Sequence, residues 1–589
     1  MISYAPPVSE MRFVLEDIAG LASLASLPGY ESATPDTVGA VLDQAAELAR
    51  DVIAPLNTSG DREGARLDNG VVRTPAGFRD AYRAFIVGGW GSLPFPEEIG
   101  GQGLPLAVSA AVSEMWNAAN LSFALCPLLT AGAADALEHH GSKEQKALYL
   151  PRLVSGEWTG TMNLTEPQAG SDVGALKTRA VKQGDHYRIT GQKIFITYGE
   201  HDLAENIIHL VLARTPGSPP GTRGISLFLV PKFLPDASGA PGQRNDVRCV
   251  GLEHKLGIHA SPTAVLSFGD SEGAIGFLVG EEHRGMACMF TMMNNARLNV
   301  GVQGIAISER AYQQARDYAR SRMQGVPIGH DGPAPIVWHP DVRRMLLLMR
   351  TRTEAARALG YFAAASLDIA RRSPDPAARA QALARAELLV PMVKAWSTDL
   401  GVENASLAVQ VHGGMGFIEE TGAAQHYRDA RILPIYEGTN GIQALDLLGR
   451  KLMRDNGAAA HALIAEMRAL DMPGEDLAAF RPALSHGIDA VEAATAHLLG
   501  TFPRDPAQAL AGATPYLTLF STVAGGWLMA KAAMAASVRL RRGEGDVSFL
   551  KAKLQSALFY IAHVLPQAAG LLSAVVNGTS VTAFDPDLL

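Results

Sequence analysis

Asn206–Arg214 (NIIHLVLAR) and Gly224–Val230 (GISLFLV) are the stretches that decide the fold of this chain. Both are strand-length runs of β-branched and large apolar residues, separated by a loop rich in proline and glycine. Further strand candidates lie at Tyr187–Thr190, Lys193–Thr197 and Ala264–Gly269. Because strands follow one another without intervening helices and no Rossmann fingerprint is present, we expect an antiparallel sheet or barrel.

Helical patterns flank this β region on both sides. In the N-terminal flank, Ser142 with Gln145 predicts a capping box that opens a helix. In the C-terminal flank, helical runs cover Met345–Ala370 and Ala377–His412, the second ended by Gly413 and Gly414. The expected fold class is therefore mainly α with a central β domain.

The length of 589 residues requires several hydrophobic cores. We expect five segments, of which the first is an N-terminal extension and the second is wholly helical. The third is the antiparallel β domain, the fourth a helical bundle and the fifth an appended C-terminal helical domain. Their predicted limits are 1–36, 37–158, 159–283, 284–452 and 453–589.

Charge and cysteine content restrict the possible partners. A net charge of −8 argues against nucleic acid and against anionic membrane surfaces, which attract basic proteins. Cys126, Cys249 and Cys288 are too few and too scattered for a disulfide framework or metal cluster, so we expect no metal and a reducing compartment. Without a targeting signal, or about 18 uninterrupted apolar residues, we expect a cytoplasmic protein with no membrane span.

One carboxylate stands out in Ile435–Gln443 (IYEGTNGIQ), where Glu437 lies between an aromatic residue and a glycine turn. We interpret Glu437 as a candidate catalytic base. The same pattern also fits an ordinary surface turn, because short motifs have many false matches.

Two further motifs could hold a flat cofactor. Thr165–Asp172 (TEPQAGSD) is a loop whose small residues let backbone amides approach a ligand, although a rigid turn explains it equally. In Lys193–Thr197 (KIFIT), strand alternation predicts Phe195 and Thr197 on one face and the two isoleucines on the other. A ring beside a hydroxyl suits a heteroaromatic ligand, and simple packing remains the alternative.

In this order, the motifs resemble those of the acyl-CoA dehydrogenase family of FAD flavoproteins over residues 37–452. The extra length at both ends resembles the long branch of that family, which includes the 3-methylmercaptopropionyl-CoA dehydrogenases. Besides the motifs above, the resemblance rests on Gly141–Lys146, Tyr149–Pro151, Gly191–Thr197, Lys255–Gly257, Arg297, Ala319–Arg322, Gln410–Phe417 and Tyr427–Arg431.

The resemblance implies an acyl-CoA dehydrogenase-like arrangement in which FAD is completed by a neighbouring subunit. It places Thr165, Phe195 and Thr197 against the isoalloxazine, and Arg322 and Gln324 at the pyrophosphate. It assigns the adenosine end to Gln410, Gly413, Gly414, Thr439 and Asn440. It assigns substrate contacts to Ser171, Asn294, Arg297 and Gly438.

The activity implied by the resemblance is α,β-dehydrogenation of an acyl-CoA thioester to the trans-2-enoyl-CoA. Glu437 would remove the α-proton while the β-hydrogen leaves as hydride, and electrons would pass to an electron-transfer flavoprotein. Some members carry the base at the position of Ala296, so here Glu437 has no rival. A homodimer or dimer of dimers is implied. Two departures from the family pattern are Gln425, where Lys or Arg is usual, and Phe195, where many relatives have Trp.

Two alternatives differ in electron acceptor or in class. An acyl-CoA oxidase would pass electrons to O2, and nothing in the sequence sets oxygen access. A DNA-binding alkylation-response relative would carry a basic C-terminal region. Residues 471–589 contain ten acidic and eight basic side chains, which argues against this second alternative. The acyl chain, whether 3-methylmercaptopropionyl or fatty, stays open.

Overall fold

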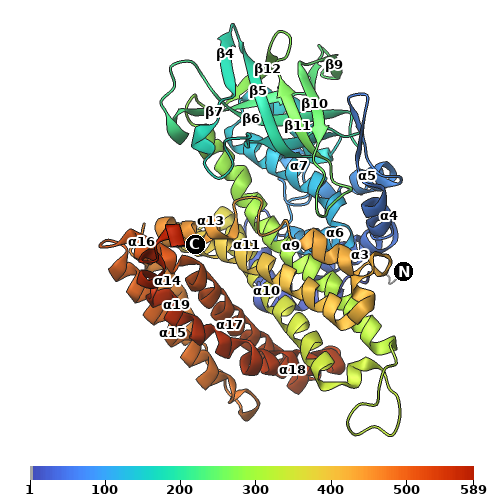
Figure 1. Ribbon diagram of the computed structural model, residues 1–589, viewed down its shortest axis with the longest axis vertical. Helices are drawn as coiled ribbons and strands as arrows, with labels where there is room; N and C mark the ends of the chain where they lie inside the picture. Colours follow the sequence, from blue (N-terminus) through green and yellow to red (C-terminus); the bar gives the residue numbers. More distant parts are fainter. Residues whose placement is uncertain (1–3, 589) are drawn as a thin grey trace. The chain divides into compact units, whose positions relative to one another are not determined.

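The computed structural model describes residues 4–588, apart from the side chains of Asn294, Asn295 and Asp476. Two compact units make up the chain (Figure 1). The β unit contains Glu47–Leu104 and Ala119–Ala296. The helical unit contains Met1–Ala46, Pro105–Ala118 and Arg297–Leu589. Each unit therefore joins segments that are far apart in the sequence.

The β unit is built on an eight-stranded sheet in the order β10-β11-β5-β12-β7-β6-β3. The off-path strand β4 pairs with β5 and with β6, so that β5, β12, β7, β6 and β4 close into a ring. Pairing is antiparallel except where β6 meets β3 and β4. The predicted antiparallel sheet or barrel is thus confirmed, with these two parallel contacts as the exception.

The predicted strands correspond to β5 (His186–Thr197), β6 (Asn206–Arg214), β7 (Ile225–Pro231) and β11 (Thr263–Phe268). The two predicted runs Tyr187–Thr190 and Lys193–Thr197 form one long strand. Four strands of the sheet were not predicted: β3 (Trp158–Asn163), β4 (Arg179–Gln183), β10 (Val247–Leu252) and β12 (Ala274–Val279). These have weaker apolar patterns or lie in loops rich in glycine.

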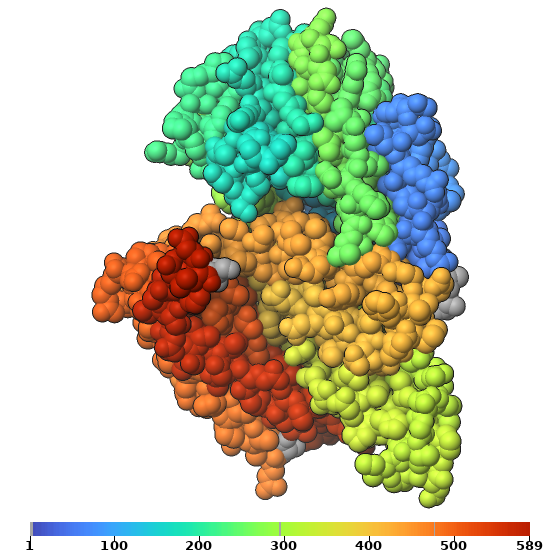
Figure 2. Space-filling view, in the orientation of Figure 1, coloured from blue at the N-terminus to red at the C-terminus, as the bar shows by residue number. Residues whose placement is uncertain are grey.

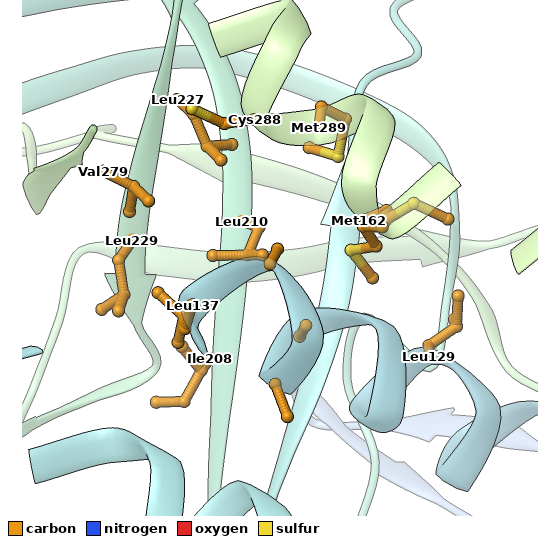
Figure 3. Close-up of a cluster of buried hydrophobic side chains, with 14 of the residues drawn as sticks. Leu129, Leu137, Met162, Ile208, Leu210, Leu227, Leu229, Val279, Cys288 and Met289 are labelled. Atoms are coloured by element: carbon orange, nitrogen blue, oxygen red, sulfur yellow. The ribbon is translucent and has the colours of Figure 1, made fainter. Parts of the chain in front are cut away.

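Strands β6 and β7 are apolar along their whole length because both of their faces are buried. On one face Ile208, Leu210 and Leu229 pack in a cluster with residues of α7 (Leu121–His140), α8 (Lys143–Ser155) and the start of α9 (Gly285–Ser321) (Figure 3). On the other face Val211 and Phe228 belong to a second cluster. A strand buried on both faces needs no polar alternation, which explains the continuous runs in the sequence.

The N-terminal part of the β unit contains helices α4 (Leu56–Glu63) and α5 (Phe78–Val87). Between them lies a hairpin of β1 (Arg66–Asp68) and β2 (Val71–Arg73). The prediction that this region is wholly helical is therefore wrong. Asn69 and Gly70 both have positive φ in the hairpin turn, so the Asn-Gly pair was the signal that could have predicted it.

Long helices dominate the helical unit, to which α9 (Gly285–Ser321) contributes its part from Arg297 onward. Helices α10 (Pro340–Arg372) and α11 (Pro376–His412) pack on each other and confirm the two predicted helical runs. Gly413 follows α11 with a φ of 60°. The predicted capping box of α8 is also present in the β unit, formed by Ser142 and Gln145.

The C-terminal helices are part of this same unit. Helix α17 (Ala513–Arg542) contacts α10 and α11 (Figure 1). On α18 (Val547–His563), the buried Lys553 Nζ bonds to Glu10 of α1 (Val8–Phe13) at 2.8 Å and to Glu354 of α10 at 2.9 Å. The N-terminal extension and the appended helices therefore meet on the central bundle. The predicted segments, which are defined by sequence position, could not show this contact.

Counting uninterrupted apolar residues missed three segments that are long and apolar enough, on average, to cross a membrane. These are Leu121–His140, Ala513–Arg542 and Val547–Val576, the last formed by α18 and α19 (Leu565–Val576). The first two windows are 78% and 83% buried inside the protein, and the third is 33% buried. Length and composition alone thus do not support the expectation of no membrane span. The first two segments are nevertheless mostly buried in the core of the protein.

Candidate active site

Glu437 lies in the turn between α12 (Ala423–Ala430) and α13 (Asn440–Asp446). Its φ of 56° and that of Gly438, 80°, are both left-handed. A residue with a β-carbon pays about 1–3 kcal/mol for such a conformation, so neighbouring groups must hold it. Residues 436–440, which we call the catalytic turn, therefore adopt a conformation imposed by their surroundings.

Hydrogen bonds from α11 and α13 hold the catalytic turn. The Lys394 Nζ donates to the Gly438 carbonyl at 2.8 Å and to Asn440 Oδ1 at 2.9 Å. The Asn440 amide donates to Asp399 Oδ1 at 2.8 Å and to the Ala395 carbonyl at 3.0 Å. The Asn440 carboxamide is thus committed within the protein, and its predicted contact with the cofactor would require these bonds to open.

The remaining polar groups of the turn serve helix α13 and the backbone. The Thr439 hydroxyl caps α13 by accepting from the Ile442 amide at 3.2 Å. Gln443 Nε2 donates to the Glu437 carbonyl at 3.2 Å. Gln443 and Lys394 were not predicted as site residues. Lys394 lies 43 residues before Glu437 in the chain, whereas Gln443 belongs to the same motif and was not assigned a role.

The Glu437 carboxyl is poised between ionised and neutral forms. Burial raises its pKa to about 7, and the charges of Arg297 and Lys394 oppose that rise. Arg297 is only 4% exposed, and its Nη1 pairs with Asp446 Oδ2 at 3.1 Å, as a buried arginine requires a partner. A base with a pKa near neutrality balances basicity against availability of the ionised form.

Tyr436 directly precedes the candidate base, and hydrogen bonds to residues of two helices hold its side chain. Its hydroxyl donates to Gln303 of α9, whose amide donates to Asn117 Oδ1 of α6 (Leu106–Ala119) at 3.1 Å. This relay could not be found from the sequence, since the three residues belong to separate motifs. These hydrogen bonds hold the Tyr436 ring, next to Glu437 in the chain, in one orientation.

In the β unit, Phe195 sits at a β-bulge. Ile196 pairs with Ala264 and Lys193 with Leu266, so two residues of β5 oppose one residue of β11. Phe195 has a φ of 59° and is 57% exposed, whereas Ile196 is buried. The bulge interrupts simple alternation between Lys193 and Ile196, although the predicted contrast between an exposed Phe195 and a buried Ile196 is present.

The loop that carries Thr165 is tied to this strand. The Ile194 amide donates to the Thr165 carbonyl at 3.0 Å, which brings Thr165 beside the bulge. The buried Lys193 Nζ donates to Glu166 Oε1 at 2.8 Å. Although burial opposes it, Lys193 lowers the pKa of Glu166 to about 2, so the pair is ionised. Thr165, Phe195 and the half-buried Thr197 thus share one region of the β unit, and Ser171 is exposed farther along the same loop.

Five predicted cofactor residues are exposed on the helical unit. The rings of Tyr318 and His412 stack with centroids 4.4 Å apart, which places the ends of α9 and α11 side by side. Gln410 lies in the last turn of α11, and beyond the helix ends lie Arg322, Gln324, Gly413 and Gly414. A β-carbon at Gly413 or Gly414 would meet no atom within 4 Å, so the backbone there is open to a ligand.

These residues fit FAD and an acyl thioester. Phe195 is an uncovered ring, and Arg322 is an exposed cation suited to a pyrophosphate. Near Glu437, Gln443 Oε1 and Arg297 Nε are buried without a hydrogen-bond partner among the described residues. Buried polar atoms of this kind are normally satisfied by a ligand or water. The side chain of Asn294, a predicted substrate contact, lies outside the described part of the chain.

One group of side chains on α7 has the distances of a metal site. The ligand atoms of Asp135, Glu138 and His139 lie within 4.8 Å of one another. His139 Nδ1 is within hydrogen-bond distance, 2.8 Å, of the Asp135 carbonyl. Asp135 is buried, Glu138 is half-buried and His139 is exposed. The sequence predicted no metal, and this partly solvated group on one helix gives no reason to add one.

Comparison with known proteins identifies the class. Residues 36–157, 161–271 and 283–453 match the acyl-CoA dehydrogenase N-terminal, middle and C-terminal domains. Residues 458–585 match a domain described as acetyl-CoA dehydrogenase C-terminal like. The chain belongs to the acyl-CoA dehydrogenase family. It is an FAD-dependent enzyme that dehydrogenates an acyl-CoA thioester, as its motifs indicated.

Among its relatives, 3-methylmercaptopropionyl-CoA dehydrogenase of Ruegeria pomeroyi is 50% identical over 98% of each chain. A butyryl-CoA dehydrogenase of Syntrophomonas wolfei is 36% identical over 97% of each chain. In structure, an acyl-CoA dehydrogenase of Bacillus anthracis complexed with FAD gives a TM-score of 0.74 at 22% identity, covering 94% of this chain and 89% of that chain. That likeness extends the fold match to the terminal helices.

Proposed function

We propose that Glu437 is the base that removes the α-proton of the acyl thioester. The observation that carries this proposal is a carboxyl held in a left-handed turn, with a pKa raised to about 7 by burial. Burial increases the proton affinity of the carboxylate, and the nearby cations keep part of it ionised at neutral pH. Arg297, anchored by Asp446, lies within electrostatic reach and helps to set that balance.

The residues that would hold FAD are Thr165, Phe195 and Thr197 at the ring, and Arg322, Gln324, Gln410, Gly413 and Gly414 toward the pyrophosphate and adenosine. FAD, when bound, supplies the acceptor for the β-hydrogen as hydride. The bulge at Phe195 turns its ring outward, and the Lys193–Glu166 pair keeps the Thr165 loop in place. Ser171 and Gly438 are the proposed contacts to the CoA ester, together with Asn294.

The substrate that we propose is 3-methylmercaptopropionyl-CoA. Support comes from the 50% identity to the Ruegeria pomeroyi enzyme, which extends over nearly the whole of both chains. A short fatty acyl-CoA is the second candidate, since a butyryl-CoA dehydrogenase also matches over its full length. We further propose an electron-transfer flavoprotein as the electron acceptor in place of O2.

We also infer a homodimer or dimer of dimers. Ile328 and Phe417 are 94% and 85% exposed, beyond the ends of α9 and α11, and a second copy would cover such apolar side chains. Analytical ultracentrifugation tests the inference, because a stable 62.3 kDa species would contradict it.

We propose a cytoplasmic location. Cys126, Cys249 and Cys288 are free and buried, which supports this location, and cell fractionation would test it.

An anaerobic titration tests the substrate proposal. The purified yellow enzyme is mixed with 3-methylmercaptopropionyl-CoA, butyryl-CoA and a long-chain acyl-CoA, and the loss of flavin absorbance is followed by stopped flow. We expect the first thioester to bleach the flavin fastest. Equal or faster bleaching by the fatty thioesters would contradict the narrower assignment. In air, dye reduction without peroxide is expected, and stoichiometric peroxide would favour an oxidase.

A further inference from the structure

Lys394 is a buried cation that the family motifs did not single out. It lies in the middle of α11 and is 0% exposed. Its Nζ donates to the Gly438 carbonyl at 2.8 Å and to Asn440 Oδ1 at 2.9 Å, both uncharged oxygens on the catalytic turn. Burying an ammonium group is costly unless it is paired, so two neutral acceptors leave its charge to act on groups nearby.

The charges that act on Lys394 come from three elements. Glu437 on the catalytic turn and Asp399 on α11 favour its charged form, whereas Arg297 on α9 opposes it. Burial is the largest influence and lowers the pKa of Lys394 to about 7. In return, the charge of Lys394 opposes the rise in the pKa of Glu437. The charge of each group therefore favours ionisation of the other.

We propose that Lys394 is the positioning residue of the catalytic turn, which it holds through Gly438 and Asn440 while its charge favours the ionised carboxylate of Glu437. The inference rests on the proposed role of Glu437 as base. One ammonium group thus performs two tasks. Its two hydrogen bonds fix the left-handed backbone at Glu437 and Gly438, and its charge sets how much of the base is available at neutral pH.

Lys394→Met tests the inference, because methionine has a similar length but neither charge nor donor. The matched control is Lys531→Met. Lys531 is a half-buried lysine of the same unit, and its Nζ lies over the Trp527 ring, 5.0 Å from the ring centroid. For each holoenzyme, the rate of anaerobic flavin bleaching by a saturating acyl-CoA is measured across the pH range. Flavin content and thermal stability are recorded in parallel.

We expect the pH midpoint of bleaching to rise by about one unit in Lys394→Met, since an opposite charge has been lost beside the base. At pH 7 the rate should fall severalfold or more, with partial recovery at alkaline pH. Lys531→Met should keep the wild-type midpoint. Lys394→Arg, which retains the charge, should restore the midpoint even where imperfect geometry keeps the rate low.

An unchanged midpoint in Lys394→Met would overturn the inference and leave Lys394 a structural residue. If Lys394→Met does not yield folded flavoprotein, Lys394→Gln, which keeps amide donors without charge, is judged by the same midpoint. Glu437→Gln separates the role of Glu437 as base from the role of Lys394. Full bleaching by Glu437→Gln would refute the base itself, whereas an inactive Glu437→Gln with an unmoved Lys394→Met midpoint would refute only the role of Lys394.

Discussion

At the scale of single residues, the ionisation of the candidate base depends on a balance of neighbouring groups. Burial stabilises the neutral form of Glu437, and the cations Arg297 and Lys394 stabilise its charged form. Asp446 pairs with Arg297 and thereby limits the charge that Arg297 contributes. A fully paired Glu437 would be a weak base, and one without cations would remain protonated at neutral pH.

The pKa of Glu437 predicts that the rate of flavin bleaching depends on pH. With a pKa of about 7, Glu437 is protonated below that value and ionised above it, so the rate of flavin bleaching should rise between about pH 6 and pH 8. Glu437→Gln should retain FAD but bleach about 10²–10⁴-fold more slowly at every pH, because the base is absent. The exposed Glu475→Gln is the matched control and should follow the wild-type profile. A flat wild-type profile from pH 5.5 to 9 would contradict the assignment.

At the scale of elements, each unit carries a predicted site residue, other than glycine, in a left-handed conformation. Phe195 adopts it within the bulge of β5, and Glu437 adopts it before α13. In each case a buried lysine bonds to the adjacent backbone or loop, Lys193 on β5 and Lys394 on α11. The strain is therefore offset by hydrogen bonds made elsewhere in the same unit.

The turn geometry predicts opposite results for two neighbouring glycines. In Gly438→Ala the new β-carbon would lie 2.8 Å from Gln443 Nε2, at a φ of 80°, so the Gln443 bonds to the turn should break. We expect FAD to stay bound while the bleaching rate falls, with losses near 10²-fold if the base moves by about 1 Å. Gly441→Ala is the control, since its β-carbon would have only Thr439 Oγ1 at 3.7 Å. Equal rates for the two variants would show that the turn is not restrained.

At the scale of the whole molecule, the two ends of the chain belong to one unit. Lys553 near the C-terminus binds Glu10 near the N-terminus and Glu354 of the central bundle, and all three are buried. Arg350 adds a bond to Glu354 at 2.7 Å. The C-terminal helices thus stabilise the bundle that carries the catalytic turn.

This network predicts a large stability effect at one position. Lys553→Met leaves two buried carboxylates without their shared cation, which costs about 3–5 kcal/mol of unfolding free energy. Lys551→Met, on the exposed side of the same helix, should be nearly neutral. Urea unfolding followed by circular dichroism compares the two. Identical midpoints would mean that the network contributes little.

Much of the architecture was predictable because its signals are local. The continuous apolar run of β6, the caps of α8 and α11 and the glutamate motif each lie within a few adjacent residues. The hairpin of β1 and β2 was missed although Asn69-Gly70 marks its turn, because its strands have three residues each. Strand β4 was missed because four of its five residues are exposed, although it pairs with the adjacent β5. Strand β12 was missed because its partners β5 and β7 lie far along the chain.

By itself, the sequence determined the class of enzyme, the cofactor and the identity of the candidate base, since these are encoded in side-chain types at short spacings. Only the tertiary structure shows that Phe195 lies at a bulge, that Asn440 is bound by α11 and that Lys394 binds the backbone carbonyl next to Glu437. The physical reason is that a pKa, a strained φ and a buried charge depend on atoms that are near in space. For Glu437, those atoms come from helices more than forty residues before it in the chain.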